Sequence, residues 1–200
     1  MGHLAMHTYK WYGFYGKNWL FKQVHYYGML LHVNLRQREK KELYPMEERL
    51  KYAKVAPQGY RAMAALQSYV DNCDLEPLLL ELVKMRASQI NGCAYCLDMH
   101  SKDARAMGES EQRLYELNAW RETPFYTERE RAALLWTEEL TLISQGHAPD
   151  AVYEEVRQHF SEEELVNLTL AIVAINGWNR LAIGFRSQPG VYQSTKKPLS

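Results

Sequence analysis

Cysteine, net charge and long apolar runs are all scarce in this sequence. Three cysteines in 200 residues are too few for the disulfide framework of a small secreted protein. The 24 Lys and Arg residues balance the 24 Asp and Glu residues, with a net charge of +5 over residues 1–45 and −5 over residues 46–200. Because phosphate binding needs clustered cations, an acidic main body argues against a nucleic-acid partner.

Membrane and export signals are missing as well. No apolar run approaches the roughly 20 residues that a membrane span needs. Lys10, Lys17 and Lys22 interrupt the N-terminal region where a signal peptide would carry its apolar core. We therefore expect a cytoplasmic, soluble protein without a membrane partner. The sequence also contains no glycine-rich phosphate loop, no G-x-S-x-G and no His-Glu-x-x-His.

The composition divides the chain into three parts. Residues 1–45 hold ten of the 24 aromatic residues and four of the seven histidines, without a helical or strand period. We interpret them as an N-terminal extension, either appended or poorly ordered, and an arm that packs on a neighbouring subunit is the alternative. Residues 46–193 have the patterning of one domain, and the polar residues 194–200 predict a flexible tail.

From Pro57 onward apolar residues recur with a helical period, and no alternating strand pattern of useful length appears. The fold class is therefore predicted to be all-α. The expected helices cover 58–72, 77–90, a segment from the cysteines to about Gly108, 110–121, a segment from Thr127 to about Gly146, a small helix capped by Asp150, and a long helix from Ser161 through Gly177. Thr127-x-x-Glu130 and Ser161-x-x-Glu164 are both capping-box patterns, which start helices.

The main chemical signal is Cys93-x-x-Cys96 followed by His100. Thiols at the N-terminus of a helix lie near the positive end of its dipole, which favours the thiolate. His100 follows Cys96 by four residues, so the two side chains share one helix face. This arrangement predicts thiol redox chemistry in which His100 can accept a proton from a thiol directly or through water.

Two further residues near this motif have open interpretations. Glu81 lies in the middle of an apolar helix and is either a solvated charge or a carboxylate aimed into a partly buried site. If it is buried, its pKa is expected to rise, which would suit a proton-relay base. Tyr95, between the cysteines, is either a hydrogen-bond donor to the site or a packed ring.

A zinc site is the main competing interpretation. Structural zinc normally takes four ligands, often from two Cys-x-x-Cys-like pairs. This chain has one such pair, with Cys73 far away in sequence, and the spacing of His100 does not suit a zinc knuckle. We therefore expect no metal and no other cofactor, and we interpret Cys73 as a passive thiol.

One pattern consists of Glu81, eleven intervening residues and then Cys93-x-x-Cys96-x-x-x-His100. It resembles the active-site signature of alkylhydroperoxidase AhpD-like proteins, which belong to the carboxymuconolactone decarboxylase superfamily. Residues 175–180, Ile-Asn-Gly-Trp-Asn-Arg, are similar to a segment of the last long helix in that family. The resemblance covers about residues 47–192. It implies an all-helical AhpD-like domain that assembles as a dimer, trimer or hexamer.

The resemblance also implies roles for the four motif residues. Cys96 would attack the peroxide, Cys93 would be its disulfide partner, and Glu81 with His100 would form the proton relay. Some family members have a histidine between the cysteines, where this chain has Tyr95.

The function implied is a thiol-dependent peroxidase that reduces a hydroperoxide and is re-reduced by a dithiol partner, either a thioredoxin-like or a lipoyl protein. Two alternatives remain open: a non-enzymatic redox-sensing or interaction module of the same fold, and a carboxymuconolactone decarboxylase-type enzyme. The decarboxylases of the superfamily do not depend on a Cys-x-x-Cys, so the presence of the pair argues against that activity.

Overall fold

The computed structural model describes residues 47–199, and these residues fold as helices joined by short connections, without a strand among them. The predicted all-α fold class is therefore confirmed. The interpretation of residues 1–45, with four of the seven histidines, lies outside the described residues.

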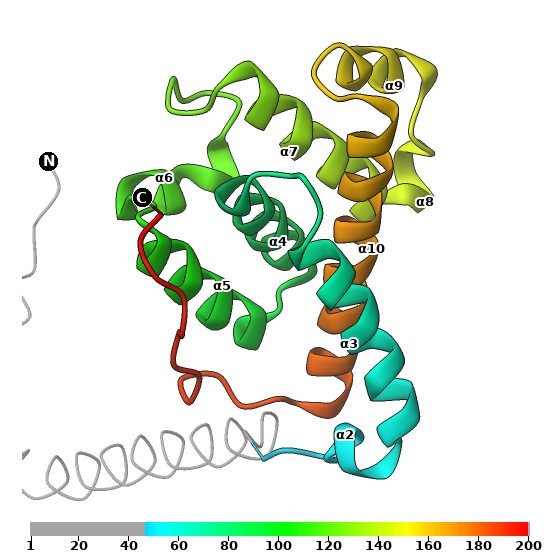
Figure 1. Cartoon of the computed structure of the whole chain (residues 1–200), viewed down its shortest axis with the longest axis vertical. Coiled ribbons are helices and arrows are strands. Elements are labelled where there is room, and N and C mark those ends of the chain that lie inside the picture. The colour runs from blue at the N-terminus through cyan, green and yellow to red at the C-terminus, as the bar shows by residue number, and fades with distance from the viewer. Residues whose placement is uncertain (1–46, 200) are drawn as a thin grey trace, which may run out of the picture. The chain divides into compact units, whose positions relative to one another are not determined.

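The helices in chain order are α2 (Tyr52–Val55), α3 (Pro57–Asp71), α4 (Pro77–Asn91), α5 (Ala94–Met107), α6 (Glu111–Glu116), the 3-10 helix η1 (Leu117–Ala119), α7 (Glu128–Thr141), α8 (Ile143–Gly146), α9 (Asp150–Arg157) and α10 (Glu162–Phe185). Helix α4 lies at the centre and packs against α5, α7 and α10, while α3 packs along α10 (Figure 1). The main hydrophobic cluster lies where α4, α7 and α10 meet and includes Val83, Ala133 and Ile172.

Local sequence signals mark most of the helix boundaries. Thr127 and Ser161 each accept a hydrogen bond from the backbone N–H three residues later, and the matching glutamates close both capping boxes. Pro77 opens α4, and Gly108 ends α5 with a φ of 108°.

Three boundaries differ from the sequence-based expectation. The helix that starts after Thr127 ends at Thr141 and gives way to the short α8, because the backbone at Leu142 leaves the helical region. The segment 110–121 is divided between α6 and η1. Asp150 was expected to cap α9, but it is the first residue of that helix and Pro149 occupies the cap position.

Among the described residues, α10 is the one helix whose length and composition would allow it to cross a membrane, with a mean hydropathy of 1.3 over its most apolar window. Its apolar side chains have another explanation, since Leu168, Ile172 and Ile175 are almost fully buried in the protein. Helix α10 contacts α3, α4, α7 and α9, as a core helix does. The polar residues Asn176, Asn179 and Arg180 interrupt its apolar run.

Candidate active site

A tight turn between α4 and α5 positions the two thiols. Gly92 ends α4 in the left-handed region, with a φ of 68°, which a residue with a Cβ adopts only under strain. The backbone N–H of Cys93 then donates to the carbonyl of Ser88 at 3.0 Å. Cys93 becomes the N-cap of α5, and Cys96 lies in its first turn. The pair lies at the start of a helix, as the motif predicted, and both cysteines are buried, with 1% exposed.

The two thiols differ in acidity. Cys93 Sγ accepts a hydrogen bond from the backbone N–H of Cys96 at 3.4 Å. The thiol of Cys96 donates to Cys93 as well, and together with Asn179 these donors lower the pKa of Cys93 to about 7 from 9.0. The pKa of Cys96 is raised, because it holds the proton that stabilises Cys93 and because it is buried. When the pair carries one negative charge, these donors favour the anion on Cys93 and the remaining proton on Cys96.

This arrangement predicts one thiolate per chain with a midpoint near pH 7. Thiolate absorbance near 240 nm, measured against pH on the reduced protein, should show that transition. Cys96→Ala should raise the midpoint, because it removes the strongest donor to Cys93. Folding lowers this pKa, so the linked stability should be lost as pH falls through 7 and be fully present above 9. The absorbance transition near pH 7 should persist in Cys73→Ser. The thiol of Cys73 is not part of the pair, because it donates to the carbonyl of Val70 at 3.0 Å. A midpoint near 9 in the native protein would contradict the assignment.

His100, on α5, is joined to Glu81 on α4. Its Nδ1 lies 2.8 Å from Glu81 Oε2, and both side chains are buried. Nδ1–H donates to the carboxylate, which leaves Nε2 as the nitrogen that can accept a proton. The structure thus resolves one open question: Glu81 is a buried carboxylate and not a solvated charge.

The expectation that burial would raise the pKa of Glu81 was wrong. Burial alone would raise it, but hydrogen bonds and positive charge from His100 and Lys84 outweigh that effect and hold the pKa at about 2, below 4.5. Lys84 Nζ lies 2.9 Å from Glu81 Oε1 and 3.3 Å from Asp71 Oδ1. Burial would lower the pKa of Lys84, but these two carboxylates raise it. Glu81 is therefore an anion near neutral pH that holds Nδ1 of His100, and its lowered pKa makes it a weak proton acceptor.

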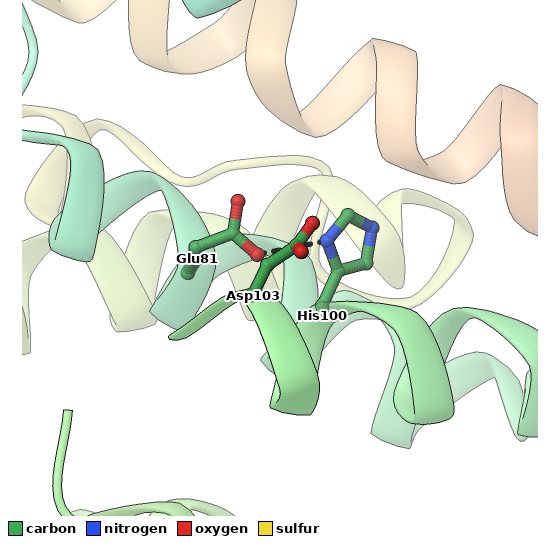
Figure 2. A group of neighbouring side chains, drawn as sticks. All are labelled: Glu81, His100 and Asp103. Atoms are coloured by element: carbon green, nitrogen blue, oxygen red, sulfur yellow. Dashed lines mark hydrogen bonds and ion pairs between the residues drawn. The ribbon is translucent and has the colours of Figure 1, made fainter. Parts of the chain in front are cut away.

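A second carboxylate lies beside this pair. One ligand-type atom each from Glu81, His100 and Asp103 lies within 4.8 Å of the others, and Figure 2 shows the three side chains facing one another. Such a group has the donor types for a divalent cation. However, the ammonium of Lys84 already binds Glu81, and the hydroxyl of Tyr192 donates to Asp103 at 2.9 Å. These donors satisfy the carboxylates, so the group fits a hydrogen-bonded network better than a metal centre.

The network opens on a cavity of about 350 Å³. Of the two thiols, Cys96 lines the cavity, together with His100, Glu81 and Lys84. Most of the remaining wall is aromatic or otherwise bulky, from Tyr52, Tyr60, Tyr95, Met99, Trp178 and Tyr192. A volume of this size is within the range of small-molecule sites. A thiol, an imidazole nitrogen that can accept a proton, and a walled space for a ligand therefore meet at Cys96.

Known proteins resemble this chain in sequence and in fold. A family model described as the carboxymuconolactone decarboxylase family matches residues 57–139. The uncharacterized protein YdfG of Bacillus subtilis is 46% identical over 138 residues, which are 69% of this chain and 94% of YdfG. A crystal structure of a protein of unknown function from Agrobacterium tumefaciens is 50% identical in sequence to this chain. That protein is described as a candidate antioxidant defence protein AhpD. The match covers 73% of this chain and all of that one, with a TM-score of 0.71.

The chain belongs to the AhpD-like carboxymuconolactone decarboxylase superfamily. The fold extends to more distant members: an alkylhydroperoxidase AhpD core from Ralstonia eutropha is 21% identical with a TM-score of 0.63, covering 79% of this chain and 86% of that one. At that level of identity, the likeness concerns the fold alone.

The sequence singled out Glu81, Cys93, Cys96 and His100. The structure brings Glu81, Cys96 and His100 to one cavity, with Cys93 at the adjacent turn. Tyr95 packs against the small cluster that contains both cysteines, which favours the packed ring over the hydrogen-bond donor.

Lys84, Ser88, Asp103 and Tyr192 were missed. One signal for Lys84 was available: a lysine three residues after a glutamate in an apolar helix indicates a buried ion pair. Ser88 accepts a hydrogen bond from Asn179 at 3.1 Å, a pairing across 91 residues that no local pattern marks.

Proposed function

We propose that this protein is a thiol peroxidase that reduces hydroperoxides through a dithiol–disulfide cycle of Cys93 and Cys96. The observation that carries the proposal is the placement of Cys96 on the wall of a cavity that it shares with the Glu81-bound imidazole of His100, with Cys93 beside it as the N-cap of α5. Membership in the AhpD-like superfamily supports a peroxidase-related role.

In the first step, Cys96 transfers its proton to Nε2 of His100 and attacks the terminal peroxide oxygen. The O–O bond breaks, a sulfenic acid forms on Cys96, and the alkoxide takes the proton back from His100 and leaves as an alcohol. Glu81 stabilises the transient imidazolium, since its carboxylate already holds Nδ1–H. No proton needs to cross to the solvent in this step.

In the second step, the thiolate of Cys93 attacks the sulfur of the sulfenic acid. An S–S bond forms and hydroxide leaves, taking back from the solvent the proton that Cys93 had released on ionising, so that two thiols and one hydroperoxide give a disulfide, an alcohol and water. The low pKa of Cys93 suits this role, because the attacking sulfur is already ionised near neutral pH. An external dithiol of the thioredoxin-like or lipoyl class then reduces the disulfide by exchange.

The test is stoichiometric. One equivalent of hydroperoxide added to the fully reduced protein should remove two of its three thiols and yield a Cys93–Cys96 disulfide by peptide mass spectrometry. Turnover should then follow when a dithiol protein is supplied. Thiol loss no faster than that of a free cysteine peptide would contradict the peroxidase. A disulfide that forms but turns over with neither dithiol class would favour the redox-sensing alternative.

A further inference from the structure

The C-terminal segment after α10, residues 187–199, lies along α5 (Figure 1), and we call it the strap. The backbone N–H of Gly190 donates to Asp98 Oδ2 at 2.9 Å, and Lys102 Nζ donates to the carbonyl of Tyr192 at 2.9 Å. Near its end, the N–H of Leu199 donates to the carbonyl of Met107 at 3.2 Å. The strap is therefore bonded to α5 at several points along its length.

Tyr192 is the strap residue that contacts Asp103 and lines the cavity. Its hydroxyl lies 2.9 and 3.1 Å from the two oxygens of Asp103, a buried carboxylate beside Glu81 and His100. Its ring lines the same cavity as Cys96. The strap thus contributes an aromatic part of the wall that the helices do not supply, and Asp103 fixes its position.

We infer that Tyr192 is a specificity-determining residue of this site, which selects hydroperoxides with an apolar organic group and limits the size of reagents that reach Cys96. The first part rests on the proposed peroxidase function. A cavity of about 350 Å³ far exceeds what hydrogen peroxide needs, since a water molecule occupies about 30 Å³. An organic group placed there can bury its surface against the Tyr192 ring, whereas hydrogen peroxide has no such group. Tyr192 acts on that group and not on the reacting oxygens.

Kinetics with two peroxides test the selection. Tyr192→Ala should lower kcat/KM for cumene hydroperoxide about tenfold, mainly through a higher KM, as expected when a wall that binds an apolar group is lost. Its kcat/KM for hydrogen peroxide should fall much less, so that the ratio of the two kcat/KM values changes several-fold. Tyr192→Phe keeps the ring but loses the hydroxyl that Asp103 holds, so its loss with cumene hydroperoxide should be smaller. An equal fall with both peroxides would overturn the proposal, because it would show that Tyr192 acts on His100 through Asp103.

Alkylation tests the wall without depending on any peroxidase activity. In a Cys73→Ser background, the rate of Cys96 modification by pyrenyl maleimide is compared with the rate by iodoacetamide, and peptide mass spectrometry identifies the modified residue. Tyr192→Ala should raise the ratio of the two rates about tenfold. Tyr115→Ala, at a position that is 69% exposed on α6, is the matched control and should leave the ratio unchanged. A native ratio in Tyr192→Ala would overturn the inference even if the protein is an active peroxidase. A raised ratio without peroxidase activity would refute the proposed function alone.

Discussion

Cys96→Ser should lower kcat/KM for hydroperoxides by about 10³-fold or more, since removing an attacking nucleophile abolishes the chemical step. Cys93→Ser should behave differently. Cys96 should still be oxidised once, and the sulfenic acid should persist long enough to be trapped by dimedone, because its disulfide partner is gone. Turnover with a dithiol should be lost in both variants. Cys73→Ser, which removes a half-buried thiol outside the cavity wall, is the control and should keep native activity.

The main alternative is that Cys93 attacks the peroxide and Cys96 is its disulfide partner, because the pKa of Cys93 is the lower of the two. Acidity favours Cys93 as the nucleophile, whereas access favours Cys96, because Cys96 lines the cavity with His100. We assign the attack to Cys96, since a thiolate that cannot meet the peroxide cannot react with it. Loss of the first oxidation in Cys93→Ser together with its retention in Cys96→Ser would reverse the assignment.

Glu81→Gln should destabilise the protein by about 3 kcal/mol at pH 7, because it leaves the buried ammonium of Lys84 without its closest counter-ion. Glu81→Gln/Lys84→Met removes both charges and should recover most of that loss. Urea unfolding of the two variants measures the difference. The pKa of Glu81 is lowered from 4.5 to about 2, so its contribution should be complete above pH 4.5 and decline as pH falls toward 2. Equal stability of the native protein and Glu81→Gln would show that the pair is energetically silent.

The same two variants separate stability from chemistry. If Glu81 orients His100 and stabilises its protonated form, peroxidase activity should stay low in Glu81→Gln/Lys84→Met although the fold is restored. Alkylation of Cys96 by iodoacetamide at neutral pH should also remain slower than in the native protein. Recovery of both rates in the double variant would mean that Glu81 serves the fold alone.

The helical framework could be predicted from the sequence because its signals are local. A capping box spans only four residues, so it predicts the start of a helix without any tertiary information. Thr127 with Glu130 predicts α7 in this way, and Ser161 with Glu164 predicts α10. The expectations failed where local signals compete or are weak, as at Leu142, where the backbone leaves the helix although the flanking residues keep a helical pattern.

The sequence by itself determined the α-helical class, the thiol pair at the start of a helix, and the spacing that places His100 one turn below Cys96. These depend on hydrogen bonds and periodicity within a few residues. Only the tertiary structure decided the state of Glu81, the wall of the cavity and the place of Tyr192. The charge of a buried carboxylate depends on the difference between its burial and its partners, and here His100 and Lys84 outweigh burial. Tyr192 meets Asp103 across 89 residues, a contact that exists only because the strap lies along α5.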